Sequence, residues 1–222
     1  MWFYRCVRPF VTGIPRVIWR VRVVGLEHVP ASGGFVLAPS HRSMMDIPFA
    51  AIVTRRRIRF MGKASLFSIP VLGSVFGWLG GFPVARDGTD RKAVRDSVAM
   101  LQAGEVLCVY PEGTRQRGPK IQPLQPGAAY LALRAGVPIL PVGMAGTEEI
   151  LRAKPDPVPR LGRVTIVVGP PIAPEPRPGG VVPRDRVDAV TSSLADALQG
   201  VFDDAYTLRD GEPGASGPGR AT

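Results

Sequence analysis

Short apolar runs alternate with longer amphipathic runs along most of the chain. This alternation is typical of an α/β domain, in which strands and helices follow one another. The clearest helical pattern is at 91–103, where Val94, Val98 and Leu101 share one face and Gly104 follows as a stop signal. We therefore predict a mixed, largely parallel central sheet flanked by helices. The predicted strands are 20–24, 34–38, 58–61, 82–85, 106–110, 138–144 and 164–168, and the predicted helices are 43–54, 65–79, 91–103, 127–135 and 185–206.

The ends of the chain differ in composition from its centre. Residues 1–24 interleave aromatic residues with arginines, which suits a membrane-associating segment that lies among lipid headgroups. The alternative is a helix that packs on the domain while its arginines extend into water. Residues 25–206 carry the α/β pattern and form the predicted domain. Residues 207–222 end in a glycine- and proline-rich stretch without apolar periodicity, so we predict a disordered tail.

The net charge of +10 indicates an anionic partner, either nucleic acid, an acidic membrane surface or a phosphorylated substrate. A nucleic-acid-binding module would interleave aromatic residues with lysine and arginine on one face of a sheet, whereas here the aromatic residues cluster at the N-terminus and inside apolar runs. We therefore expect no nucleic acid. Cys6 and Cys108 are far apart, and no cluster of histidine, cysteine and carboxylate residues has ligand spacing, so we expect no metal site.

His41 belongs to the segment 39–46, which follows the apolar run 35–38 directly, and the carboxyl end of a buried strand is where α/β sheets bind their ligands. Asp46 lies five residues further on, about 140° past a full helical turn, so the two residues would not share a helix face. They can meet if His41 lies on a loop and Asp46 in the first turn of a helix capped by Ser43. Asp46 would then orient the imidazole while the other ring nitrogen takes a proton from an alcohol. The alternative is that Asp46 only completes a capping box with Ser43.

Two arginines stand where predicted strands end, Arg86 after 82–85 and Arg115 after 106–110. Their planar guanidinium groups suit a clamp for a phosphate monoester, although either side chain could instead be solvated. Gly113 would allow a close turn of the backbone, and Glu112 would orient an arginine or the acceptor hydroxyl. Lys63 follows another predicted strand and could add positive charge to the same edge.

Four segments resemble the ordered motifs of the glycerolipid acyltransferases, the 1-acylglycerol-3-phosphate acyltransferase family. The first is His41 to Asp46, a histidine and an aspartate separated by four residues. The second runs from Gly80 to Arg86 and departs somewhat from the usual form at Pro83 and Ala85. The third is Glu112-Gly113-Thr114-Arg115, and the fourth is the apolar run 137–142. The resemblance covers about residues 34–142.

The resemblance implies a direct acyl transfer without an acyl-enzyme. His41 would be the general base, Asp46 would orient it, and the acceptor alkoxide would attack the thioester carbonyl. Lys63 or backbone amides would stabilise the oxyanion. No cofactor is implied beyond the co-substrate, which is acyl-CoA or acyl carrier protein. The substrate-binding residues would be Arg86, Glu112, Gly113, Thr114, Arg115 and Lys63.

The implied acceptor is lysophosphatidate, and the product is phosphatidate for phospholipid biosynthesis. Glycerol 3-phosphate or another lysophospholipid is the alternative acceptor, and a non-enzymatic lipid-binding relative is the alternative outside the enzymes. No stretch has the ~20 apolar residues that span a bilayer, so we expect peripheral or monotopic contact with an anionic membrane at the cytoplasmic face of the cell membrane. The sequence makes no prediction about oligomeric state.

Overall fold

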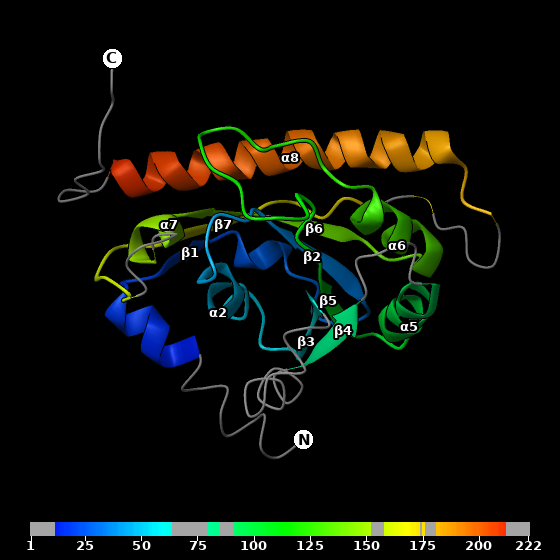
Figure 1. Cartoon of the computed structure of the whole chain (residues 1–222), viewed down its shortest axis with the longest axis horizontal. Coiled ribbons are helices and arrows are strands. Elements are labelled where there is room, and N and C mark those ends of the chain that lie inside the picture. The colour runs from blue at the N-terminus through cyan, green and yellow to red at the C-terminus, as the bar shows by residue number, and fades with distance from the viewer. Residues whose placement is uncertain are drawn as a thin grey trace.

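The computed structural model describes residues 12–63, 80–84, 91–151, 158–173, 175 and 181–211. Its centre is a seven-stranded sheet with the order β1-β7-β6-β2-β5-β3-β4, in which only the pairing of β6 with β7 is antiparallel (Figure 1). The predicted mixed, largely parallel sheet is therefore confirmed. All seven predicted strands occur, as β1 (Arg22–Val24), β2 (Phe35–Pro39), β3 (Ile58–Lys63), β4 (Gly81–Val84), β5 (Val106–Cys108), β6 (Ile139–Ala145) and β7 (Thr165–Val168).

Helices cover both faces of the sheet, as the alternation of side chains along β2 requires. Phe35 and Leu37 pack in one core cluster with Phe49 of the short helix α2. Val36 and Ala38 point to the other face and pack in a second cluster with residues of α5, α6 and α8. No helix in the described ranges is long and apolar enough to cross a membrane. Besides a helical turn at residues 12–18 and the 3-10 helix Leu26–His28, the helices are α2 (Asp46–Ala50), α5 (Arg91–Gln102), α6 (Gly127–Ala135), α7 (Thr147–Ile150) and α8 (Arg184–Asp210).

Helix boundaries differ from the prediction where polar side chains compete for the backbone. The helix predicted at 43–54 is the shorter α2, because the Asp46 carboxylate accepts the N–H groups of Arg42 and Ser43 and holds these residues in a turn before the helix. The four-residue α7 was not predicted, since it is too short to show a period. The helix predicted at 65–79 lies outside the described residues.

Two boundaries of the predicted domain need correction. β1 pairs with β7 through Arg22–Val24, so residues 22–24 belong to the sheet, although we assigned residues 1–24 to the membrane-associating segment outside the domain. α8 continues to Asp210, so residues 207–210, which we expected to be disordered, are helical. Val201, Phe202 and Ala205 are buried along the helix, and this packing holds its C-terminal half on the sheet.

The ends of the strands define the edge of the sheet at which the candidate site lies. β2, β5 and β6 run parallel and finish at one edge, which we call the carboxyl edge. β7 is antiparallel to β6 and β1 is parallel to β7, so these two strands begin at the same edge. The loops after β2 and β5 and the segments before β1 and β7 therefore meet there.

Candidate active site

His41 lies on the loop that follows the central strand β2, as the sequence predicts. The chain leaves β2 at Pro39, and the Ser40 hydroxyl accepts the Met144 N–H of the neighbouring strand at 3.1 Å. The imidazole stacks on the Tyr110 ring with centroids 4.1 Å apart and planes inclined by 28°. Its side chain is 13% exposed, so the ring is largely enclosed but still reachable from the carboxyl edge.

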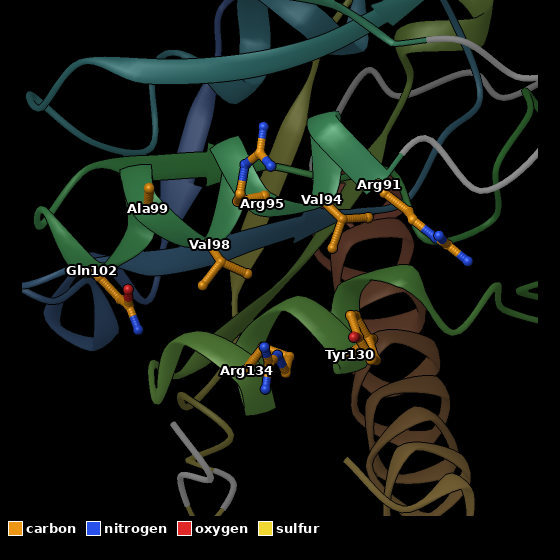
Figure 2. A pocket seen from close by; sticks show the side chains of 8 residues that line it. All are labelled: Arg91, Val94, Arg95, Val98, Ala99, Gln102, Tyr130 and Arg134. Atoms are coloured by element: carbon orange, nitrogen blue, oxygen red, sulfur yellow. The ribbon is translucent and has the colours of Figure 1, made fainter. Parts of the chain in front are cut away.

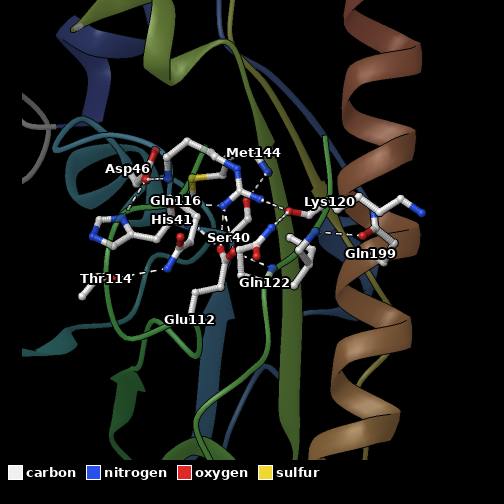
Figure 3. A network of polar contacts seen from close by, with 12 residues as sticks. Ser40, His41, Asp46, Glu112, Thr114, Gln116, Lys120, Gln122, Met144 and Gln199 are labelled. Carbon is white, nitrogen blue, oxygen red and sulfur yellow. Dashed lines mark hydrogen bonds and ion pairs between the residues drawn. The ribbon is translucent and has the colours of Figure 1, made fainter. Parts of the chain in front are cut away.

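One oxygen of Asp46 holds both the imidazole and the loop (Figure 3). Oδ2 accepts the N–H groups of Arg42 at 2.6 Å and Ser43 at 2.8 Å, and it lies 2.8 Å from Nδ1 of His41. Because Oδ2 acts as an acceptor, Nδ1 carries the hydrogen, and in the neutral imidazole Nε2 then carries the lone pair. Within the described ranges, Nε2 has no hydrogen-bond partner. Asp46 thus caps the turn before α2 and orients the imidazole with the same atom.

The Glu112 carboxylate is buried and occupied by groups of the protein itself. Oε1 accepts the His41 N–H at 2.9 Å and Nη1 of Arg42 at 2.8 Å. Oε2 accepts the same Nη1 at 2.9 Å and the Gln122 N–H at 3.1 Å. The structure therefore places this carboxylate against the His41 loop, with both oxygens bonded to the protein, and its predicted contact with substrate stays a prediction. Of the two predicted orienting roles, the geometry favours the orientation of an arginine, and that arginine is Arg42.

Arg42 is a buried residue of the candidate site that the sequence reasoning missed. Its side chain is 2% exposed, its Nη2 donates to the Lys120 carbonyl at 3.1 Å, and its guanidinium lies 4.6 Å from the centre of the Phe202 ring on α8. Arginines are rarely buried unless they are paired. The available signal was an arginine beside the motif histidine, directly after an apolar strand, with Glu112 at the end of another strand.

The loop after β5 runs along the His41 loop and supplies the rim of the site. The Gln116 N–H donates to the His41 carbonyl at 2.8 Å, and Gly113 adopts a φ of 73° at the start of this loop. Thr114 and Arg115 are exposed, and the Thr114 hydroxyl accepts the Gln116 amide at 3.0 Å. The structure thus places Arg115 at the rim, next to the residue that bonds to the His41 loop.

The other two predicted cationic residues are only partly described. Lys63 is the last residue of β3, which ends at the carboxyl edge, but its side chain lies outside the described residues. Arg86 follows β4 and also lies outside them. The phosphate clamp therefore stays a prediction. Among the described residues, no group of three or more histidine, cysteine, aspartate or glutamate side chains is arranged to hold a metal ion.

A cavity of about 550 Å³ lies between α5 and α6, apart from these residues (Figure 2). No residue that lines it belongs to the His41 site. Its lining combines cationic and apolar side chains and consists of Arg91, Val94, Arg95, Val98, Ala99, Gln102, Tyr130 and Arg134.

The fold and the histidine–aspartate pair at the carboxyl edge define an acyltransferase domain. The profile of the Acyltransferase family matches residues 20–145, more than half of the chain, and the chain belongs to this family. It is 26% identical over 156 residues to the 1-acyl-sn-glycerol-3-phosphate acyltransferase of Bacillus subtilis, covering 68% of this chain and 73% of that one. It is also 26% identical over 157 residues to the chloroplast 1-acyl-sn-glycerol-3-phosphate acyltransferase BAT2 of Brassica napus.

Coverage differs among these relatives. The match to the Brassica napus protein takes in 69% of this chain but only 45% of that one, so this chain spans about half the length of some relatives. The crystal structure of the 1-acyl-sn-glycerophosphate acyltransferase PlsC from Thermotoga maritima superposes with a TM-score of 0.66 and 25% identity, over 89% of this chain and 80% of that one. The likeness to PlsC therefore includes most of the described fold.

Proposed function

We propose that this protein transfers a fatty acyl group from a thioester donor, acyl-CoA or acyl carrier protein, to the free hydroxyl of lysophosphatidate, giving phosphatidate. The observation that carries this proposal is the 2.8 Å contact between Nδ1 of His41 and Asp46, which leaves Nε2 available as a base at the carboxyl edge. The Bacillus subtilis and Brassica napus relatives support the choice of acceptor, because both are 1-acyl-sn-glycerol-3-phosphate acyltransferases.

The proposed reaction uses His41 as general base and then as general acid. Nε2 takes the proton of the acceptor hydroxyl, and the oxygen attacks the thioester carbonyl carbon. The tetrahedral intermediate collapses, the C–S bond breaks, and the thiolate leaves with the proton that Nε2 had taken. Asp46 stabilises the imidazolium between these two steps and keeps its ring in one orientation.

The acceptor phosphate needs cations at the same edge. Arg115 at the rim supports this role, and we propose that Arg86 completes a clamp while Lys63 or backbone amides stabilise the oxyanion. Gly113 and Thr114, in the same exposed turn, would shape the phosphate subsite. We assign Glu112 to positioning of the His41 loop, since both oxygens of its carboxylate accept hydrogen bonds from the protein itself.

Release of free thiol from a long-chain acyl-CoA, measured with and without lysophosphatidate, tests the proposal. His41→Ala should abolish the acceptor-dependent release, with a loss of at least about 100-fold for a missing general base. His28→Ala is the matched control, because His28 is the only other histidine and its ring bonds to the Val168 carbonyl at the opposite edge of the sheet. It should keep the activity.

Parallel assays with glycerol 3-phosphate, with other lysophospholipids and with an acyl carrier protein donor identify which acceptor and which donor the protein uses. Transfer only to another acceptor would refute the assignment of lysophosphatidate as acceptor but keep the assignment of acyl transfer. Thiol release that survives in His41→Ala would overturn the mechanism. Folded protein without release from any pair would leave the lipid-binding alternative.

A further inference from the structure

Two segments that are distant in the sequence form one surface at the carboxyl edge. The Trp19 indole N–H donates to the Arg160 carbonyl at 2.7 Å, and the Val164 N–H donates to the Trp19 carbonyl at 3.2 Å. The Arg22 N–H donates to the Val164 carbonyl at 2.9 Å. Residues 12–22 and 158–164 are therefore joined immediately before the strands that they lead into. We call them the two-segment surface.

The two-segment surface is joined to the helix that carries Asp46. The Trp19 ring packs edge-on against Phe49 of α2, with centroids 5.8 Å apart and planes inclined by 85°. In Figure 1, the helical segment at residues 12–18 and α2 both lie below the sheet, on the side opposite α8. The position of this surface relative to the His41 loop is thus fixed by packing.

Large apolar side chains on this surface face solvent. The described residues include eight exposed large hydrophobic residues, and five of them lie here. Leu161 is 83% exposed, although burial of a leucine side chain would stabilise by about 1.5–3 kcal/mol. Exposed apolar residues gathered at one place mark an interaction site. The five are Ile14, Val17, Ile18, Val158 and Leu161.

The charge of the two-segment surface indicates an anionic partner. Residues 12–22 and 158–164 contain five arginines and no aspartate or glutamate. Arginines interspersed with apolar residues match the interface of an anionic bilayer, where the apolar groups enter the acyl boundary and the guanidinium groups meet phosphates. An acidic protein partner would match the charge, but the proposed acceptor is itself a membrane lipid, which favours the bilayer.

We propose that the two-segment surface is a single contact with an anionic lipid bilayer, to which residues 158–164 contribute as much as the N-terminal segment. This contact turns the carboxyl edge toward the lipid, so the lysolipid hydroxyl approaches His41 from the bilayer. The exposed Met44, in the loop between His41 and α2, lies on this approach. The proposal rests on the proposed function for its substrate but concerns a separate set of residues.

Co-sedimentation of the full chain with vesicles of phosphatidylcholine, alone or mixed with phosphatidylglycerol, tests this contact. Leu161→Asp should lower the partition coefficient on mixed vesicles about 10-fold or more, because it removes an inserted side chain and adds a repelled charge. The matched control is Val181→Asp. Val181 is 89% exposed and lies between the Ile139–Ile172 bridge and α8, toward the opposite edge, so its substitution should leave binding unchanged.

The electrostatic part is tested by Arg16→Glu, an exposed position in the same surface. It should weaken binding to the phosphatidylglycerol vesicles about 10-fold and change binding to phosphatidylcholine much less. Leu161→Asp binding like the unmodified protein would overturn the proposal. A loss of vesicle binding in Val181→Asp as large as that in Leu161→Asp would also overturn it. So would a loss of binding in Arg16→Glu that is equal on both kinds of vesicle.

An activity assay separates this proposal from the proposed function. On a short-chain lysophosphatidate dispersed as monomers, Leu161→Asp should react at the unmodified rate, whereas on vesicle-embedded lysophosphatidate its rate should fall in step with its binding. Vesicle binding lost in Leu161→Asp, with no acyl transfer by any form, would refute the proposed function and keep the membrane surface. Acyl transfer by the unmodified protein, together with unchanged vesicle binding of Leu161→Asp, would refute the membrane surface and keep the proposed function.

Discussion

Glu112→Gln tests whether a buried ion pair holds the His41 loop in place. Both carboxylate oxygens accept two donors each: His41 N–H and Arg42 Nη1 on one, Arg42 Nη1 and Gln122 N–H on the other. The glutamine amide nitrogen would therefore meet two donors in either orientation. The Arg42 guanidinium would also lose its counter-charge while only 2% of its side chain is exposed.

The expected cost follows from this burial. Removal of one partner from a buried ion pair typically destabilises a protein by about 3–5 kcal/mol, because the other charge stays buried. For a chain of this size that corresponds to a fall in Tm of about 6–20 °C. The exposed pair between Lys92 and Asp96 is the control, since its lysine is 77% exposed, and Lys92→Gln should cost no more than about 1 kcal/mol.

Urea unfolding at equilibrium, followed by circular dichroism, measures these free energies, and a double-mutant cycle isolates the pair. Arg42→Met combined with Glu112→Gln should cost about 2 kcal/mol less than the sum of the single changes, because no unpaired charge remains. Thiol release by the double variant should be slower than by the unmodified protein, since the His41 N–H is then held by a neutral acceptor. Additive costs, or a Glu112→Gln protein as stable as the Lys92→Gln control, would refute this account of the loop.

Three further predictions concern charge, packing and pH. Asp46→Asn keeps an acceptor oxygen for the loop but loses the charge that would stabilise the imidazolium, so the thiol-release rate should fall about 100-fold, with a smaller fall in Tm than in Glu112→Gln. Gly143→Ala places a Cβ 2.1 Å from a carbonyl of α8 and should lower the free energy of unfolding by about 3 kcal/mol, measured in urea. Burial raises the pKa of Glu148 above its usual 4.5, so its contribution to stability is present below that pH and is lost as the pH rises through the folded value. The unfolding free energy of the unmodified protein should therefore fall relative to Glu148→Gln as the pH rises.

Each of these predictions has a control or a contrary result. A fall in Tm in Asp46→Asn without a fall in its thiol-release rate would indicate that Asp46 only caps the helix. Gly200→Ala, on the open side of α8, should stabilise the helix by about 0.5–1 kcal/mol, and a cost equal to that of Gly143→Ala would contradict the packing argument. A difference in the free energy of unfolding between Glu148→Gln and the unmodified protein that stays constant across the pH range would contradict the link between burial and the raised pKa.

The sheet could be predicted from the sequence because its signals are local. Buried strands are short apolar runs whatever lies beside them, and α6 (Gly127–Ala135) matches the predicted range because its buried face repeats with the helical period. The beginning of α2 could not be placed in this way. It depends on which N–H groups Asp46 captures, and that choice was made by a tertiary arrangement that also includes His41.

The candidate site was only partly accessible for the same physical reason. The contact between His41 and Asp46 spans five residues, so the sequence spacing could be tested against helix geometry. The pairing of Arg42 with Glu112 spans seventy residues and exists because β5 lies beside β2 in the sheet. In the sequence, each of these charges is indistinguishable from one that faces water.

Glu112 and Asp46 together explain how a loop can hold His41, the proposed base, in one position. Asp46 holds the N–H groups of Arg42 and Ser43, and Glu112 holds the N–H group of His41, so three successive backbone groups are fixed by two buried carboxylates. The imidazole is then fixed at Nδ1 and along one face by Tyr110. A general base must lie within hydrogen-bond reach of its proton, and an error of about 1 Å can cost about 100-fold in rate. We therefore infer that the acidic residue of the Glu-Gly-Thr-Arg segment acts on the base, while the exposed residues that follow it are the ones available to the substrate.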